Sequence, residues 1–351
     1  MEVNSENLFE INGRAIASGQ PCYLVAEVGT TCLGELSKAL DLIAAAADAG
    51  MDAVKFQMID PDQLSDDEVE YRFSAGGVEH VLNMKEMFER LSFSDDEWSE
   101  VQKACLAHGV DFFATVDYVG GVDRLEKLNV AVHKIGAWDI TYRQLVEKIA
   151  ATGKSLIVDL GPAAEKNLDD LVEWTRTCGG GNLLLLHDFH TSIPEQMNMQ
   201  AISYLNHSYK IPCGFSSPAR DDDLDVLAIG LGAVMLEKRL IMSREEIAFH
   251  ADESLEPDEL KVWVSRIRHV ESALGKQQVI PSDADIELSK EYFRSVCTLA
   301  PIAKGEQLSE DNVGAKRPGI GIPTTRMREF IGKECASSLE ENHLIREEDV
   351  L

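Results

Sequence analysis

The chain has 351 residues, of which 44% are hydrophobic and 27% charged, as in ordinary folded globular proteins. Its 33 basic and 61 acidic residues give a formal charge of −28, which argues against nucleic acid and anionic membranes as partners. Seven scattered cysteines without a C-x-x-C pair fit reduced thiols, and we find neither an export signal nor an apolar run of membrane length. We therefore expect a cytoplasmic protein without a membrane span.

The predicted elements alternate between strands and helices. An Asn12-Gly13 turn between short alternating segments predicts an N-terminal β-hairpin. From residue 23 onward, a short apolar strand, a polar turn and a helix-period segment recur, and Ser94 opens one of these helices with a capping signal. The predicted strands are 23–27, 53–57, 111–115, 131–135, 155–160, 182–187, 211–216 and 233–237.

Eight strands alternating with helices favour parallel pairing through right-handed crossovers, and eight is the number that closes a barrel. The predicted fold class is therefore α/β, a (β/α)8 TIM barrel. A doubly wound open sheet is the alternative. The segment from Glu27 to Gly34 argues against it because it lacks the G-x-G-x-x-G loop expected after the first strand of that fold.

The remaining segments set the domain organisation. The insertion 59–93 is long for a loop between strand and helix and mostly polar, so it is either an active-site cover or an ordinary surface excursion. A helix predicted at Pro257–Leu274 ends at Gly275 and precedes a small strand-rich module. The predicted domains are a hairpin cap (1–20), the barrel (21–275), a linker (276–290) and a small β-rich domain (291–351).

Charged residues stand at several predicted strand ends, where barrel enzymes place their catalytic side chains. Lys55 and Lys134 lie inside otherwise apolar strands, so each ammonium must be solvated or paired. Together with Arg239 they predict an anion pocket at the mouth of the barrel. The alternative is that these lysines only form ion pairs with Glu27 or Asp139.

A set of ordered motifs resembles the sialic acid synthase family over almost the whole chain. Members of that family condense phosphoenolpyruvate with an N-acetylated amino sugar to a nine-carbon 2-keto acid. The resemblance implies a C-terminal antifreeze-like (SAF) domain and a domain-swapped homodimer. The motifs are PCYLVAEVG (21–29), DAVKFQ (52–57), HKIG (133–136), GFS (214–216), GAVMLE (232–237), SLEP (254–257) and KRPG (316–319).

The resemblance also implies roles for the matching residues. Glu27 matches an acidic residue in the active site, Asp139 matches a carboxylate on the sugar side, and Arg317 matches an arginine that reaches the partner subunit's sugar site. The positions that match the phosphoenolpyruvate contacts are Lys55, Thr115, Lys134 and Ser216.

The metal site implied by the resemblance is where this sequence departs from the family. The family binds a divalent metal (manganese or magnesium) through two histidines, and these positions are Pro218 and Arg239 here. Proline has no side-chain donor and arginine is permanently cationic, so we predict no metal cofactor. Trp138, Asp159 and His250 also depart from the family's residues, and Trp138 is expected to fill space in the pocket.

Three functions remain open at this point. The first is a divergent synthase in which Arg239 replaces the metal as an electrophile. The second is a catalytically inactive or regulatory paralogue that binds a sugar or a phosphorylated ligand. The third is a metal-free aldolase that forms a Schiff base on Lys55 or Lys134. A rebuilt metal site is a further alternative, with the ligands His187, Asp188, His190 and His250.

Overall fold

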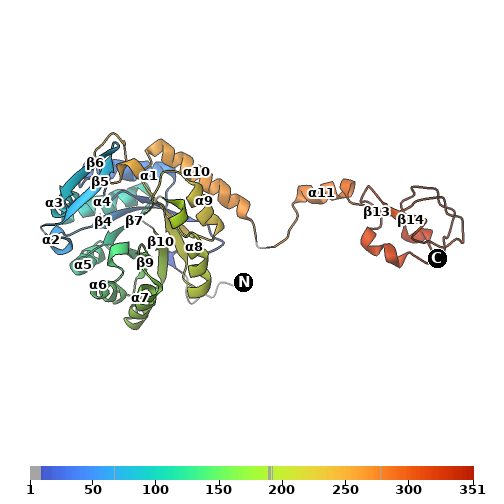
Figure 1. The fold of residues 1–351 in the computed structure, drawn as a ribbon, viewed down its shortest axis with the longest axis horizontal. Coiled ribbons are helices and arrows are strands. Elements are labelled where there is room, and N and C mark those ends of the chain that lie inside the picture. Colours follow the sequence, from blue (N-terminus) through green and yellow to red (C-terminus); the bar gives the residue numbers. More distant parts are fainter. Residues whose placement is uncertain (1–8, 67, 189–190, 192, 277) are drawn as a thin grey trace. The chain divides into compact units, whose positions relative to one another are not determined.

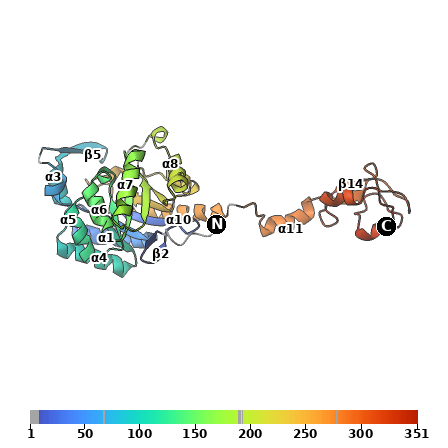
Figure 2. The ribbon, with the colours of Figure 1, turned by 90° about the horizontal axis from the view of Figure 1, so that it is seen from below.

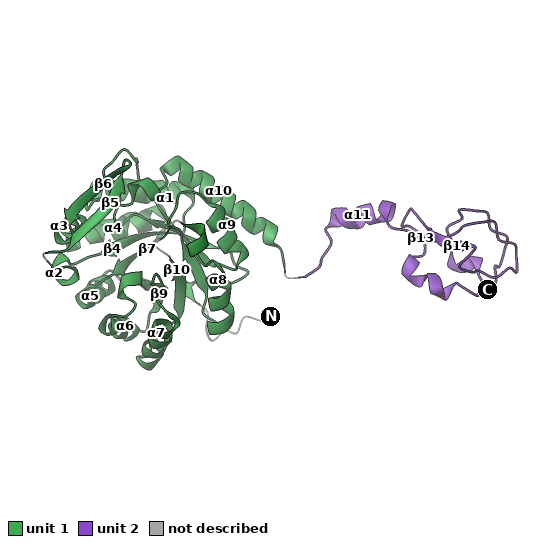
Figure 3. Cartoon of the chain, in the orientation of Figure 1, with its two compact units in different colours: residues 1–275 green, residues 276–351 purple. Residues whose placement is uncertain are grey.

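The computed structural model describes residues 9–66, 68–188, 191, 193–276 and 278–351. The chain divides into two compact units, residues 1–275 and residues 276–351 (Figure 3). No helix within the described ranges is long and apolar enough to cross a membrane.

The first unit is a closed barrel of eight parallel strands, which confirms the predicted fold class (Figure 1). Neighbouring strands around the ring follow the order β3, β4, β7, β8, β9, β10, β11, β12, and β12 pairs with β3 to close it. Some strands begin up to two residues later than predicted. Their bounds are β3 Tyr23–Glu27, β4 Ala53–Met58, β7 Asp111–Val116, β8 Val132–Ile135, β9 Ser155–Asp159, β10 Leu183–His187, β11 Cys213–Ser216 and β12 Met235–Arg239.

Helices surround the strands on the outside of the barrel, as Figures 1 and 2 show. Local signals set their ends: Ser94 and Glu97 form a capping box at the start of α4, and Gly50 adopts a left-handed conformation (φ 87°) after α1. The helices are α1 Leu36–Ala49, α4 Asp95–His108, α5 Val119–Lys127, α6 Arg143–Ala150, α7 Glu165–Thr177, α8 Gln200–Tyr204, α9 Asp223–Gly230 and α10 Pro257–Leu274.

The N-terminal hairpin fills the end of the barrel where the strands begin. It consists of β1 (Glu10–Ile11) and β2 (Arg14–Ala15), which pair antiparallel. Phe9, Ile11 and Ile16 are buried in one apolar cluster with inward-facing residues of the strands. These strand residues are Tyr23, Val25, Ala53, Phe113, Val132, Ile157, Leu184, Leu186 and Met235. The lower interior of the barrel is therefore apolar and packed, and any ligand must enter from the opposite end.

The polar insertion 59–93 forms two helices and a hairpin: α2 (Pro61–Leu64), β5 (Glu70–Ala75), β6 (Val78–Asn83) and α3 (Met84–Leu91). The hairpin packs against the loop between β12 and α10, where the rings of Phe73 and Phe249 are 4.6 Å apart. Asp252 of that loop accepts hydrogen bonds from the Ser74 hydroxyl (2.7 Å) and the Gly76 amide (3.0 Å). Since this loop follows the carboxyl end of β12, the insertion is anchored at the mouth of the barrel.

The second unit contains helix α11 (Asp283–Tyr292) and two short antiparallel strands, β13 (Ser295–Thr298) and β14 (Val313–Lys316). Helix α11 overlaps the segment predicted as a linker, and the Ser282 side chain caps its first turn. A separate apolar core holds the strand-rich part together, with members Val296, Ile302, Leu308, Val313, Phe330 and Ile345. This unit therefore has its own hydrophobic core.

Candidate active site

The interior of the barrel changes from apolar to charged at the carboxyl ends of the strands. Residues two apart on a strand face the same side. On five strands, the residue two positions after an inward-facing apolar residue is charged, and it therefore also faces the interior. The apolar residues are Val25, Ala53, Val132, Ile157 and Met235. At most 7% of each of these charged residues is exposed. This buried cluster consists of Glu27, Lys55, Lys134, Asp159 and Glu237.

Glu237 lies at the centre of the buried cluster because it contacts both lysines. Its carboxylate is 2.7 Å from Lys134 Nζ and 3.3 Å from Lys55 Nζ. Asp159 Oδ2 lies 3.1 Å from Lys134 Nζ, and Lys55 also forms an ion pair with Glu27. The lysines are thus paired, as the alternative prediction allowed for Glu27. Burial of five ionisable groups is tolerated because each charge has an opposite charge beside it.

The surroundings shift the pKa values within the buried cluster in different directions. Burial, reinforced by Lys134, lowers the pKa of Lys55 to about 8 against the opposing effect of Glu237. Burial raises the pKa of Asp159 to about 7, although Lys134 opposes this shift. Burial alone would raise the pKa of Glu237, but Lys134 and Lys55 lower it to about 2. Glu237 is therefore fixed as an anion, whereas Asp159 and Lys55 titrate near neutral pH.

Asp139 is paired with Asp117, a carboxyl group to which the sequence assigned no role. Asp139 ends a short 3-10 turn (Ala137–Asp139) after β8, and Asp117 follows the adjacent strand β7. The two side chains are hydrogen-bonded to each other. Burial raises the pKa of Asp117 to about 7, with a further contribution from Asp139, and burial raises the pKa of Asp139 to about 6. The pair can hold one proton between its carboxyl groups at neutral pH.

Thr115 and Ser216, the two predicted hydroxyl contacts, are both buried at the mouth. Ser216 Oγ donates to Glu237 Oε1 at 3.5 Å. Among the described residues, Thr115 Oγ1 and Asp159 Oδ1 are buried without a hydrogen-bond partner. A buried polar atom without a partner is costly, and such atoms commonly mark where a ligand or water binds.

Arg239 lies beyond Glu237 on the same side of β12, and its guanidinium is held by an acidic loop residue. Its Nη1 donates to Glu253 Oε2 at 3.2 Å, and the same oxygen is 3.1 Å from His250 Nδ1. Tyr71 of the β5–β6 hairpin lies in the same environment, where burial raises its pKa and Arg239 opposes the shift. The structure thus places a fixed cation at the mouth of the barrel.

Pro218 and Arg239, the residues that the sequence resemblance aligns with metal ligands, do not fit a divalent cation. Pro218 is half-buried and offers no donor, and the Arg239 guanidinium would repel a metal ion. Across the described parts of the chain, no group of three or more His, Cys, Asp or Glu side chains is arranged to hold a metal.

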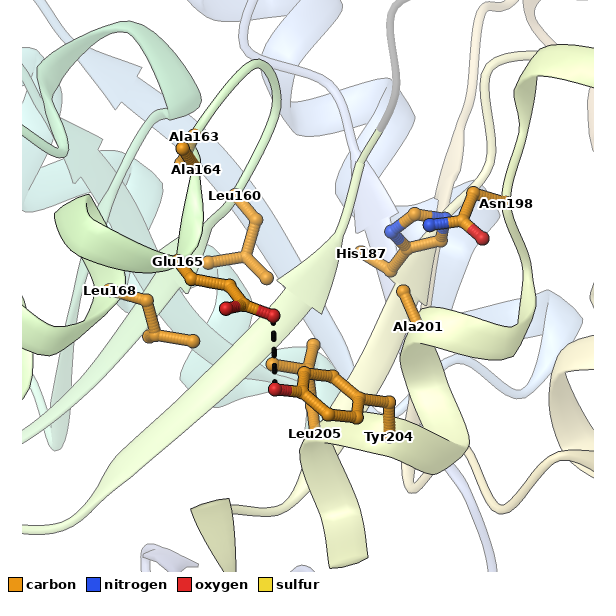
Figure 4. Close-up of a pocket in the computed structure, with 10 residues that line it drawn as sticks. All are labelled: Leu160, Ala163, Ala164, Glu165, Leu168, His187, Asn198, Ala201, Tyr204 and Leu205. Atoms are coloured by element: carbon orange, nitrogen blue, oxygen red, sulfur yellow. Dashed lines mark hydrogen bonds between the residues drawn. The ribbon is translucent and has the colours of Figure 1, made fainter. Parts of the chain in front are cut away.

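The alternative histidine ligands do not come together in the described residues. His187 points to the outer face of β10, where its Nε2 lies 2.6 Å from Met197 O and its ring stacks on Phe215. There it lines a small cavity of about 160 Å³ beside α7 and α8 (Figure 4). His250 instead contacts Glu253, Asp188 is buried directly after β10, and His190 lies outside the described residues.

Trp138 and Arg317, two further residues singled out in the sequence, lie outside the buried cluster in the structure. Trp138 is 69% exposed, so its indole does not fill the pocket as the sequence led us to expect. Arg317 belongs to the second unit, where its Nε donates to Tyr292 O at 2.7 Å and its guanidinium lies over the Tyr292 ring. The proposed contact between Arg317 and a sugar stays a prediction.

The closed parallel barrel, its buried charged cluster and the separate small antiparallel unit define a barrel protein with an appended domain. The model of the NeuB family matches residues 42–279, and that of the SAF domain matches residues 293–351. The chain therefore belongs to the NeuB family and carries a SAF domain.

Known proteins resemble the chain over most of its length. It is 30% identical to an uncharacterized protein of Methanocaldococcus jannaschii, covering 97% of this chain and 98% of that one. It is 26% identical to N,N'-diacetyllegionaminic acid synthase of Legionella pneumophila, covering 94% and 95%. The solved N-acetylneuraminic acid synthetase of Leptospira borgpetersenii has the same fold, with a TM-score of 0.71 at 24% identity over 81% of this chain and 96% of that one.

Proposed function

We propose that the chain is a divergent carbon–carbon bond-forming synthase that condenses phosphoenolpyruvate with an amino-sugar aldehyde to a nonulosonic 2-keto acid. Membership of the NeuB family and the similarity to a legionaminic acid synthase support this proposal. The observation that carries it is the convergence of two buried lysines and two buried hydroxyls on one end of the barrel. Such a site can hold a small, highly charged anion out of water.

The donor half of the proposed site consists of Lys55, Lys134, Thr115 and Ser216. The two ammonium groups neutralise phosphate and carboxylate oxygens, and the hydroxyl of Thr115 is available to donate because nothing in the described structure occupies it. These side chains lie on the separate strands β4, β7, β8 and β11, so the rigid barrel fixes their spacing.

The proposed chemistry requires proton transfer near neutral pH. When C3 of phosphoenolpyruvate attacks the aldehyde carbon, the aldehyde oxygen gains charge and must take a proton, and water must lose a proton as it adds to C2 before phosphate leaves. Asp139, sharing a proton with Asp117, can donate the first, and Glu27 beside Lys55 can accept the second.

The acceptor half is assigned to Arg239 and Arg317. The family's divalent metal would polarise the aldehyde carbonyl, but the residues at its positions do not fit one. Arg239, oriented by Glu253, is instead the hydrogen-bond donor that faces the developing oxyanion. Arg317 is proposed to bind the sugar across a domain-swapped homodimer, where a planar guanidinium suits paired oxygen acceptors.

The test is phosphate release from phosphoenolpyruvate in the presence of a panel of N-acetylated amino-sugar aldehydes, with and without manganese. We expect release without added metal, its loss in Lys134→Met, and no change in Lys166→Met, whose lysine is exposed on α7. No release with any acceptor would reject the synthase and favour the regulatory paralogue. Stoichiometric manganese or zinc in the purified protein would overturn the proposal of a metal-free site.

One observation favours the Schiff-base aldolase as a second candidate. Lys55 is buried and has a pKa lowered to about 8, so a substantial fraction of its amine is neutral and nucleophilic near physiological pH. An aldolase would form an imine between this amine and a keto acid. Borohydride reduction in the presence of pyruvate, followed by mass spectrometry, decides the matter, because the absence of an adduct on both Lys55 and Lys134 excludes this function.

A further inference from the structure

The buried cluster at the mouth contains one more acid than base. Glu27, Asp159 and Glu237 face Lys55 and Lys134, so full ionisation leaves one net negative charge in a site shielded from water. An anionic ligand that enters this site adds further negative charge. Because uncompensated buried charge is costly, binding is favoured when one of the three carboxylates is protonated.

The contacts identify Asp159 as the carboxylate that takes the proton. Glu237 contacts both lysines, which fixes it in the ionised form. Glu27 accepts a hydrogen bond from the Gly29 amide at 2.7 Å and pairs with Lys55. Asp159 has the single ion pair with Lys134, and its Oδ1 is buried without a hydrogen-bond partner in the described structure.

Asp159 also lies where a ligand oxygen would need a donor. Strands β7, β8 and β9 are neighbours, so Thr115 and Asp159 flank Lys134 on its two sides. Thr115 Oγ1 and Asp159 Oδ1 are the two buried oxygens there without a partner in the described chain, and Lys134 is fully buried between their strands. A protonated carboxyl group adds an O–H donor to this arrangement.

We propose that Asp159 binds the phosphoryl or carboxylate oxyanion of the donor as a neutral carboxylic acid, so that anion binding takes up one proton. This inference rests on the donor site of the proposed function and adds a residue to it. The proton enters from solvent, forms the O–H bond of Asp159 and is released when the anion leaves. Asp159 is a binding residue in this step, and no covalent bond to the ligand forms.

The neighbours of Asp159 define when this proton is available. Charged groups face it from β8 (Lys134), β4 (Lys55), β12 (Glu237), the end of β10 (Asp188) and the end of β7 (Asp117). Burial and the neighbouring carboxylates raise its pKa to about 7 against the effect of the lysines. Anion binding is therefore strong below pH 7 and weakens as the pH rises and Asp159 loses its proton.

The experiment measures anion binding by calorimetry, with sulfate, pyruvate and phosphoenolpyruvate as separate ligands. Sulfate and pyruvate do not titrate between pH 6 and 8, so they isolate the protein's own proton and separate a phosphate-type from a carboxylate-type site. With a single linked pKa of about 7, the dissociation constant should rise about fourfold from pH 6 to 7.5. Titrations at pH 7.5 in buffers of different ionisation enthalpy should show uptake of about three quarters of a proton, the fraction of Asp159 that is ionised before the anion binds.

Two substitutions test the assignment to Asp159. Asp159→Asn should abolish most of the pH dependence, leaving a change of about 1.5-fold or less from Lys55, and should bind the anions at least as tightly at pH 7.5. Asp159→Ser should behave in the same way. Asp41→Asn, an exposed residue on α1, is the matched control and should retain the proton uptake.

Several results would overturn the proposal: binding without proton uptake, an unchanged pH dependence in both variants, or no binding of any of the three anions. If neither variant folds, the proton count of the unmodified protein still decides. Phosphate release without proton uptake would reject this inference and leave the synthase standing. Proton uptake on anion binding without any phosphate release would support the role of Asp159 and reject the synthase function.

Discussion

Lys238 offers a quantitative test of how the loop after β11 is held in place. This lysine points outward from β12 and is 1% exposed. Its Nζ donates to Asp225 Oδ2 at 2.7 Å, to Ala219 O at 2.6 Å and to Asp221 O at 2.9 Å. The Lys238 ammonium therefore holds the loop of residues 217–221, which includes Pro218.

The substitution Lys238→Met should lower the free energy of unfolding by about 3–5 kcal/mol, the usual cost of removing one partner of a buried ion pair. The carbonyls of Ala219 and Asp221 can turn to water because neither residue is buried. Asp225 cannot, because it is fully buried, and after loss of the ammonium its described side-chain donors are the neutral Trp263 indole N–H, at 2.8 Å, and the Ser217 hydroxyl. Most of the loss therefore comes from an unpaired carboxylate.

Urea unfolding followed by tryptophan fluorescence measures this loss in the barrel alone. All four tryptophans, at positions 98, 138, 174 and 263, lie in the first unit. The double variant Lys238→Met/Asp225→Leu removes both charges and should recover most of the lost stability. Loss of the lysine should raise the pKa of Asp225 further above its ordinary value. Because the native state then binds this proton more tightly than the unfolded state does, the defect should shrink as the pH falls from 7 to 5.

A loss of less than about 1 kcal/mol in Lys238→Met would contradict an unpaired Asp225 carboxylate, because leaving a buried carboxylate without its partner costs more than that. A double variant as unstable as the single one at every pH would contradict it as well. In that case the loss would come from packing of the lysine chain and the loop, not from the charge of Asp225.

Three further predictions concern the mouth of the barrel. The double variant Pro218→His/Arg239→His should bind manganese, detected by electron paramagnetic resonance, whereas the unmodified protein should not. No binding by the double variant would show that other residues also exclude the metal. Asp139→Asn should reduce phosphate release about a hundredfold and remove the rate dependence on pH between 6 and 7, so an unaltered pH profile would reject the proton shared with Asp117. Asp252→Ala should release the β5–β6 hairpin. Proteolysis within residues 70–83 should become faster while the free energy of unfolding stays nearly unchanged. An unchanged rate of proteolysis would refute the anchoring role of Asp252.

The barrel could be predicted because each strand carries its own signal. Short apolar runs ended by charged residues recur between helical segments, and the period of two within a strand assigns the positions of Lys55, Lys134 and Glu27 to the interior. The same rule could not be applied to β10, because Leu183–Leu186 are all leucine and the inward face cannot be distinguished. His187 consequently looked like a site residue although it faces the helices.

The pairing within the buried cluster could not be predicted because it depends on distances across the barrel. β8 and β12 stand on opposite sides of the ring, yet Lys134 reaches Glu237, 103 residues away in the chain. Asp139, a predicted partner of the lysines, instead pairs with Asp117 because β7 and β8 are adjacent. Strand order is a fold-level property that no local sequence window contains.

The predicted swap of the SAF domain can be tested by mixing two inactive variants. If Arg317 serves the partner's barrel, a dimer of one Lys55→Met chain and one Arg317→Ala chain has one site with both residues intact and one site with neither. Random mixing makes half of the dimers mixed, so about a quarter of the original phosphate release should return. If Arg317 served its own barrel, no site in the mixed dimer would be complete.

The control is a second mixture, in which chains carrying Lys55→Met are mixed with chains carrying Lys134→Met. Both lysines lie in the same buried cluster of one barrel, so exchange of chains cannot restore either site. Recovery in the first mixture and none in the second would assign Arg317 to the partner subunit. No recovery in the first, with mixed dimers demonstrated by size and mass, would contradict the swap without affecting the barrel chemistry. A surface arginine that only covers the Tyr292 ring would, by contrast, leave the Arg317→Ala chain fully active on its own.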